Sequence, residues 1–84
     1  MNDIRAVVRD FILTQCLPGE SPENLRDDTP LQGSGILDSM KTLKLVSVIE
    51  ETEGFSVEAH EVDEANFQSV DNIVAFVEGK RVAR

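Results

Sequence analysis

The sequence has little of the chemistry that builds disulfides, metal centres or general bases. It holds one cysteine and one histidine among 84 residues. The lone Cys16 cannot form a disulfide within the chain, so we expect a fold held by its core in a reducing compartment. One cysteine and one histidine cannot assemble a closed zinc site. His60 lies in a stretch that we interpret as a linker, where no helical spacing brings a serine or cysteine beside it, so we predict that the chain is not an enzyme.

Basic residues are also scarce: eight Lys and Arg oppose sixteen Asp and Glu, which gives a net charge of −8. They cluster only near the end, at Lys80, Arg81 and Arg84, which argues against nucleic acid or an anionic membrane as a partner. Basic protein partners are favoured instead. No stretch is long enough to span a membrane, and residues 1–5 lack a basic region followed by an apolar core. We therefore expect no membrane segment and no signal peptide, and a cytoplasmic protein.

Apolar residues recur at helical spacing in three parts of the chain. The spacing predicts helices over residues 3–16, from residue 39 to 53, and from about 70 to 79, with at most a short helical turn over 62–66. We predict an all-α fold, a small bundle of three main helices plus one short helix. The length suits a single domain over residues 1–84.

Capping residues mark the ends of these helices. Asn2 or Asp3 can cap the first helix and Ser69 the last, whereas Gly54 and Gly79 are placed to end the second and the last. The predicted core consists of Val7, Val8, Phe11, Leu43, Val46, Ile49, Phe55, Phe67, Ile73, Val74 and Phe76. At the end of the first helix, Cys16 is interpreted as a small buried hydrophobe, with a reactive thiol as the alternative.

A connection of about twenty residues follows the first helix, and prolines and glycines interrupt it throughout. We expect Leu25, Leu31, Ile36 and Leu37 to anchor it over the helices. Neither Asp27-Asp28 nor Asp63-Glu64 has the alternating oxygen ligands and central glycine of a calcium loop. The glycines of this connection precede a helix, but no Lys-Ser/Thr follows them as in a phosphate-binding loop.

The loop ends in Gly35-Ile36-Leu37-Asp38-Ser39-Met40, which is the most informative segment of the chain. It places a serine hydroxyl in the first turn of a helix, directly after the flexible Gly33-Ser34-Gly35. The preceding Asp38 can cap the helix and can also help hold a cationic partner, or a metal bound by that partner. The alternative is that Asp38 and Ser39 act only as a helix cap.

This segment resembles the Asp-Ser-Leu signature of acyl carrier proteins and peptidyl carrier proteins, with Met40 in place of leucine. The resemblance covers nearly the whole chain. It includes the helix of residues 3–16, the long loop, and the segments over residues 50–57 and 66–73.

The resemblance implies that Ser39 carries 4′-phosphopantetheine, transferred from coenzyme A by a phosphopantetheinyl transferase. The thiol of this arm would hold an acyl or aminoacyl group as a thioester. Asp38 would assist recognition by the transferase, and Met40 would dock into partner pockets, unless it is a core residue. Leu37 and Val62 would flank the arm, or act only in the structure. A monomer would be loaded by an acyl or aminoacyl ligase or adenylation enzyme and would serve downstream biosynthetic enzymes.

Two lysines depart from the carriers of fatty-acid synthesis, in which the second helix is strongly acidic near the serine. Lys41 and Lys44 stand in its first two turns, and acidic residues return only from Glu50 onward. We expect both lysines to take part in partner recognition. The stretch is also similar to discrete aminoacyl carriers, including the D-alanyl type, and to stand-alone carriers of specialised pathways. The alternative is an unmodified interaction or regulatory module that uses an acidic face over residues 50–64.

Overall fold

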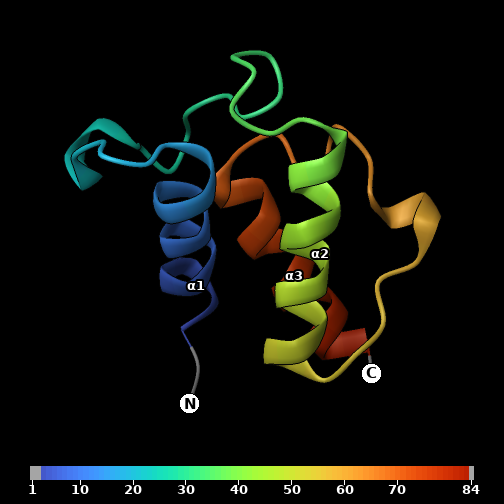
Figure 1. The fold of residues 1–84 in the computed structure, drawn as a ribbon. Helices are drawn as coiled ribbons and strands as arrows, with labels where there is room; N and C mark the ends of the chain where they lie inside the picture. Colours follow the sequence, from blue (N-terminus) through green and yellow to red (C-terminus); the bar gives the residue numbers. More distant parts are fainter. Residues whose placement is uncertain (1–2, 84) are drawn as a thin grey trace.

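The computed structural model describes residues 3–83 and contains helices joined by turns and loops (Figure 1). The elements in chain order are α1 (Ile4–Phe11), η1 (Ile12–Cys16), η2 (Pro22–Asn24), α2 (Ser39–Glu53), η3 (Ala59–Glu61) and α3 (Val70–Ala83). Over residues 3–83 there is no strand, and the three main helices confirm the predicted all-α bundle. α1 contacts both α2 and α3, and the long loop crosses the end of the bundle at which α2 begins.

The first helix covers the expected residues but changes its winding before it ends. Asp3 is the N-cap, since its side chain accepts a hydrogen bond from the Arg5 backbone N–H. Asn2, the other predicted cap, lies outside the described residues. The last turn, η1, is a π-helix, and it closes with a bond from the Leu17 N–H to the Ile12 carbonyl at 2.9 Å. Cys16 therefore reaches the end of the bundle that holds the start of α2.

Most of the predicted core is buried. Phe67, Ile49, Ile73 and Val8 are fully buried, and three of the loop anchors, Leu25, Leu31 and Leu37, join the same cluster. Phe11, Val46, Phe55 and Val74 are also buried, whereas Val7, Phe76 and the fourth anchor, Ile36, are partly buried against the cluster. Long-loop residues thus supply part of the core, which explains how so short a chain covers its helices.

Leu43 is the clear error in the predicted core, because its side chain is 63% exposed. α2 buries one stripe of residues, namely Thr42, Leu45, Val46 and Ile49. Leu43 follows Thr42 by one residue, about 100° further around the helix, and this turn carries it away from the stripe. Met40 lies one turn earlier and is 69% exposed, so its alternative role as a core residue is wrong.

The last helix does not end at Gly79 as predicted but continues to Ala83. Lys80 and Arg81, which follow the glycine, form ion pairs with Glu61 and Glu53. These contacts, together with the favourable position of cations at a helix C-terminus, stabilise one more turn of α3. They offset the cost of about 1 kcal/mol that an interior glycine brings relative to alanine.

The short helical turn lies at Ala59–Glu61 rather than over residues 62–66. Reciprocal capping places it there: the Glu58 N–H donates to the Glu61 carboxylate at 2.8 Å, and the Glu58 side chain accepts from the Glu61 backbone. The following residues form a turn in which the Asn66 N–H donates to the Asp63 carboxylate. Val62 consequently comes directly after η3, not inside a helix.

Candidate functional site

Ser39 is the first residue of α2, and its side chain is exposed. Asp38 is the N-cap, with its carboxylate accepting from the Lys41 N–H at 2.8 Å. The Asp38 carbonyl accepts from both the N–H and the hydroxyl of Thr42, at 2.9 and 2.8 Å. The predicted capping role of Asp38 is therefore confirmed, and it fixes the helix start that presents the serine.

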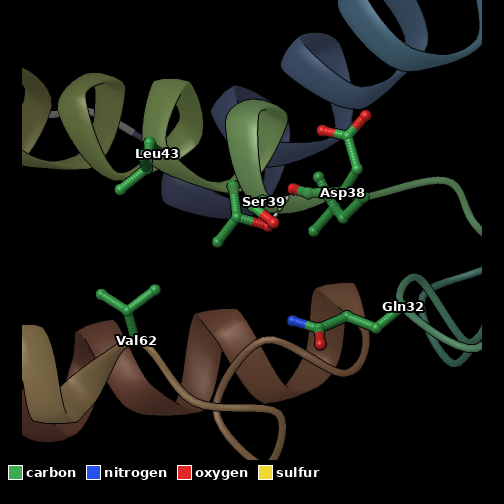
Figure 2. A pocket seen from close by; sticks show the side chains of 7 residues that line it. Gln32, Asp38, Ser39, Leu43 and Val62 are labelled. Atoms are coloured by element: carbon green, nitrogen blue, oxygen red, sulfur yellow. Dashed lines mark hydrogen bonds between the residues drawn. The ribbon is translucent and has the colours of Figure 1, made fainter.

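A cavity of about 550 Å³ opens beside Ser39. Its lining residues are Gln32, Leu37, Asp38, Ser39, Thr42, Leu43 and Val62. In Figure 2, Leu43, Ser39 and Asp38 lie on one side of the space, and Val62 and Gln32 lie on the other. The volume falls within the range of about 300–1,000 Å³ that is usual for small-molecule sites. Leu37 and Val62, which the family resemblance places beside an arm, both border this cavity.

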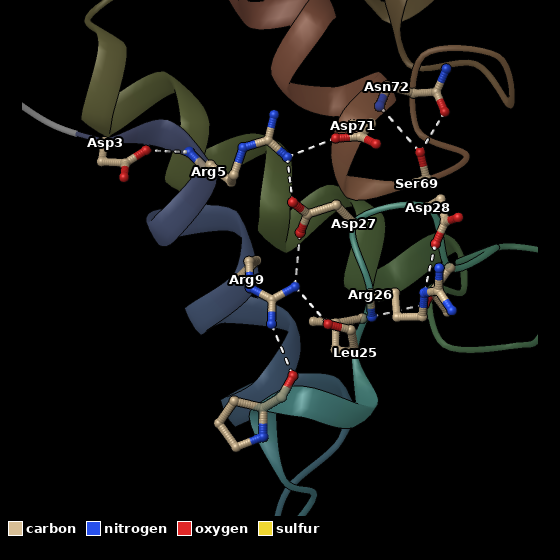
Figure 3. A network of polar contacts seen from close by, with 12 residues as sticks. Asp3, Arg5, Arg9, Leu25, Arg26, Asp27, Asp28, Ser69, Asp71 and Asn72 are labelled. Carbon is tan, nitrogen blue, oxygen red and sulfur yellow. Dashed lines mark hydrogen bonds and ion pairs between the residues drawn. The ribbon is translucent and has the colours of Figure 1, made fainter.

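An ion-pair network holds the first half of the long loop against the helices (Figure 3). Asp27 accepts from Arg5 at 2.7 Å and from Arg9 at 2.9 Å, while Arg5 also contacts Asp71 at 2.7 Å. Arg9 donates in addition to the Leu25 carbonyl at 2.6 Å. The hydrogen bond to Asp71 is the leading cause that raises the pKa of Arg5. Residues of α1, the loop and α3 are thereby joined through two carboxylates, those of Asp27 and Asp71.

Backbone hydrogen bonds close the second half of the loop. The Leu31 N–H donates to the Gln68 carbonyl at 2.7 Å, and the Leu37 N–H donates to the Leu31 carbonyl at 2.9 Å. Between them, Gly35 takes a positive φ of 82°, a conformation that glycine adopts without a steric penalty. Leu31 and Leu37 are buried at the two ends of this turn. The loop is thus a folded turn that delivers the chain to Ser39 at a fixed place.

The exposed face of α2 next to Ser39 is apolar and basic. Met40 and Leu43 are three residues apart, so they are neighbours on the helix surface. Lys44 is exposed and Lys41 is partly buried on the same two turns. The sequence interpretation included both lysines but assigned Leu43 to the core. The spacing of three residues from Met40 is the signal that could have placed Leu43 on the exposed face, because residues three apart share one face of a helix.

Cys16 packs partly buried against the core near this end of the bundle. Burial is the largest cause that raises the pKa of its thiol, while Lys41 and Asp38 act on it electrostatically in opposite directions. This environment agrees with the interpretation of Cys16 as a small hydrophobe.

The acidic residues after α2 are used largely within the fold. Glu53 pairs with Arg81, and Glu61 pairs with Lys80 at 2.5 Å. The Glu50 carboxylate accepts from a backbone N–H of the following linker at 2.8 Å. Much of the acidic face expected over residues 50–64 therefore has internal partners.

Over residues 3–83, no group of histidine, cysteine and carboxylate side chains could hold a metal ion. No helix in this part of the chain is both long and apolar enough to cross a membrane. His60 lies on η3 and is not one of the residues that line the cavity beside Ser39.

No protein-family model and no curated protein sequence matches the chain, but solved structures do. One is a holo acyl carrier protein from Nitrosomonas europaea, with 29% identity and a TM-score of 0.74 over 98% of this chain and 99% of that one. This chain is an acyl-carrier-protein-like carrier. A second match is a chain in a crystal structure described as an FAD-dependent dehydrogenase, with 30% identity and a TM-score of 0.75. That match covers 83% of this carrier and 97% of the other chain, which is therefore shorter than this one.

The family assignment agrees with two predictions made from the sequence. The carrier has the expected helical bundle, and it is a carrier protein rather than an enzyme. The roles of its individual site residues remain predictions.

Proposed function

We propose that Ser39 is the attachment site of 4′-phosphopantetheine, transferred from coenzyme A by a phosphopantetheinyl transferase. The observation that carries this proposal is the exposed Ser39 hydroxyl at the capped start of α2, beside an open cavity. The holo state of the Nitrosomonas europaea acyl carrier protein supports it, since this chain covers nearly all of that protein. The arm supplies a thiol that carries acyl or aminoacyl groups as thioesters.

The residues around Ser39 fit such a group. A phosphate on this hydroxyl lies at the N-terminus of a 15-residue helix, where the helix dipole favours negative charge. Lys41, two residues further on, adds a cation in the same turn. The cavity offers the apolar side chains of Leu37, Leu43 and Val62 to the rest of the arm.

We further propose a discrete carrier of a specialised biosynthetic pathway, loaded by an acyl or aminoacyl ligase or adenylation enzyme. Lys41 and Lys44 support this, because they flank the exposed Met40 and Leu43 beside the attachment site. Enzymes that read acidic carriers present basic patches, and like charges across an interface oppose docking. The monomeric state and the cytoplasmic location remain predictions from the sequence.

FAD-dependent dehydrogenases are one class of downstream enzyme to test. The reason is that a crystal structure described as such an enzyme contains a chain that this carrier matches over 97% of its length. Binding of the loaded carrier to purified members of this class, compared with unloaded carrier, tests the idea. Equal and weak binding of both forms would contradict it.

The alternative is an unmodified module that binds partners through acidic residues 50–64. The internal pairing of Glu53 and Glu61 with Arg81 and Lys80 counts against this function, because paired carboxylates are less available to a partner. It also leaves the exposed serine and its cavity without a role.

Intact-mass analysis after incubation with coenzyme A and a broad-specificity transferase tests the attachment. We expect one added arm in the natural protein and none in Ser39→Ala. The matched control is Ser47→Ala, which removes another exposed serine hydroxyl from the same helix and should still gain one arm. Circular dichroism of each variant checks the fold.

Two results would contradict the proposal: an arm that persists in Ser39→Ala, or no added mass with several transferases. The second result would favour the unmodified module. Loading of the modified protein with amino acids or with fatty acids then separates the two kinds of carrier.

A further inference from the structure

We propose that Gln32 is a positioning residue for the arm on Ser39, and that its side-chain amide hydrogen-bonds the amide groups of that arm within the cavity beside α2. This inference rests on the proposed attachment at Ser39. It assigns a role to a residue of the long loop for which the sequence offered no function.

Two other polar side chains of the cavity already make hydrogen bonds within the fold. The Asp38 carboxylate accepts from the Lys41 N–H, and the Thr42 hydroxyl donates to the Asp38 carbonyl. Ser39 would be consumed by the attachment itself. Gln32 is the remaining polar side chain in the lining, and no hydrogen bond engages its amide group within residues 3–83.

The fold holds the Gln32 backbone while leaving its side chain free. The Gln32 carbonyl accepts from the Gly35 N–H at 3.1 Å, and the preceding Leu31 is fully buried in the core. Figure 2 shows the Gln32 side chain extending into the space between α2 and the segment that carries Val62. A fixed backbone reduces the ordering cost of any hydrogen bond that this partly buried side chain makes.

The chemistry of the cavity matches that of a pantetheine arm. Such an arm alternates apolar carbon groups with two amides, each of which has one donor and one acceptor. A glutamine amide offers two donors and an acceptor oxygen, so it can hydrogen-bond either the carbonyl or the N–H of an amide. Leu37, Leu43 and Val62 supply apolar contacts for the carbon groups. One free amide beside these three apolar side chains gives the arm a defined register along the cavity.

The proposal can be tested by NMR on isotope-labelled apo and holo protein, with intact mass confirming that the arm is attached. We expect the side-chain amide resonances of Gln32 to shift on attachment. We also expect cross-relaxation between the arm and the methyl groups of Leu43 and Val62. In Gln32→Leu the population of docked arm should fall about two- to tenfold, the range that one hydrogen bond supports.

The matched control is Gln15→Leu, the same chemical change in a different groove, lined by residues of α1, η1 and α2. It should leave the arm signals unchanged. Gln32→Asn keeps the polarity but shortens the side chain, and it should reproduce the loss if Gln32→Leu does not fold.

Each outcome bears on the inference. Attached arm with unmoved Gln32 resonances, or equal arm signals in the natural protein and both Gln32 variants, would overturn the role of Gln32 and leave the attachment intact. Absence of added mass would overturn the attachment at Ser39 and the inference with it.

Discussion

Lys80 on α3 forms an ion pair with Glu61 on η3, and both side chains are largely shielded, at 19% and 21% exposed. The Lys80 ammonium also lies 5.5 Å from the centre of the Phe55 ring, a favourable cation–π geometry. Because Val62 follows Glu61 directly, this pair holds one wall of the cavity beside Ser39.

We expect the Glu61 pair to make stability fall at acidic pH. The hydrogen bond to Lys80 is the first cause that lowers the pKa of Glu61 in the folded protein. The stabilisation is thus present above the pKa of the unfolded chain and is lost as pH falls through the lower, folded value. In Glu61→Gln, urea unfolding should give lower stability at pH 7 and a weaker loss between about pH 5 and 3. Glu64→Gln, an exposed change nearby, is the control, and parallel pH profiles for natural protein and Glu61→Gln would contradict the prediction.

Two leucines of α2 should differ sharply in their contribution to stability. Leu45→Ala empties a fully buried site and should cost about 2–5 kcal/mol in the free energy of unfolding. Leu43→Ala removes an exposed side chain and should change it by less than about 0.5 kcal/mol. Denaturant unfolding of both variants measures the difference. A large loss in Leu43→Ala would mean that this residue is packed after all.

The same pair of leucines shows which features of the fold could be predicted from the sequence and which could not. Periodicity and caps located α2 to the residue, and the signature located Ser39, because both are local properties of the chain. Leu43 and Leu45 are equally apolar, and tertiary packing of α2 against the rest of the core decides which one is buried. The end of α3 depends likewise on Lys80 and Glu61, which are 19 residues apart. No local sequence pattern pointed to Gln32, because its proposed role depends on the residues from α2 and from the segment after η3 that line the same cavity.

Charge reversal on α2 should change partner choice more than folding. The double variant Lys41→Glu, Lys44→Glu should fold normally, load more slowly with its cognate enzyme and be recognised better by enzymes of fatty-acid synthesis. Exposed charge pairs are each worth about 0–1 kcal/mol, so the effect should appear mainly in association rates and their salt dependence. Arg26→Glu, a change at an exposed site on the loop, should leave loading rates unaltered. Equal rates for the double variant and the natural protein would mean that the two lysines are only part of a solvated helix face and take no part in partner recognition.

Removing the carboxylate of Asp27 should loosen the loop. Asp27→Asn weakens its ion pairs with Arg5 and Arg9, and we expect a loss of about 1–2 kcal/mol, at the low end for charged hydrogen bonds because the site is partly exposed. Limited proteolysis should then cut within residues 17–37 faster than in the natural protein. Asp28→Asn, whose only ion pair within residues 3–83 is with the exposed Arg26, is the control. Unchanged cleavage in Asp27→Asn would show that backbone hydrogen bonds are enough to hold the loop in place.

Cys16 should react slowly with alkylating reagents. Burial raises the pKa of its thiol, so less thiolate is present at neutral pH than for a free cysteine. The measurement is the rate of iodoacetamide labelling at pH 7.5 in Ser39→Ala, which would have no arm thiol to compete. Labelling should accelerate when the protein is unfolded in urea, and equal rates in both states would contradict the prediction.

The position of Asp27 has a consequence for the order in which the protein folds. Its side chain binds residues of the first helix, and its carbonyl accepts from the Asp71 N–H at the start of the last helix. Contacts between such distant parts of the chain form only after the intervening loops have closed, which is entropically slow. We therefore expect the loop before Ser39 to become ordered in the final stage of folding. A transferase that reads this loop would then act only on finished molecules, so that attachment of the arm would also report completed folding.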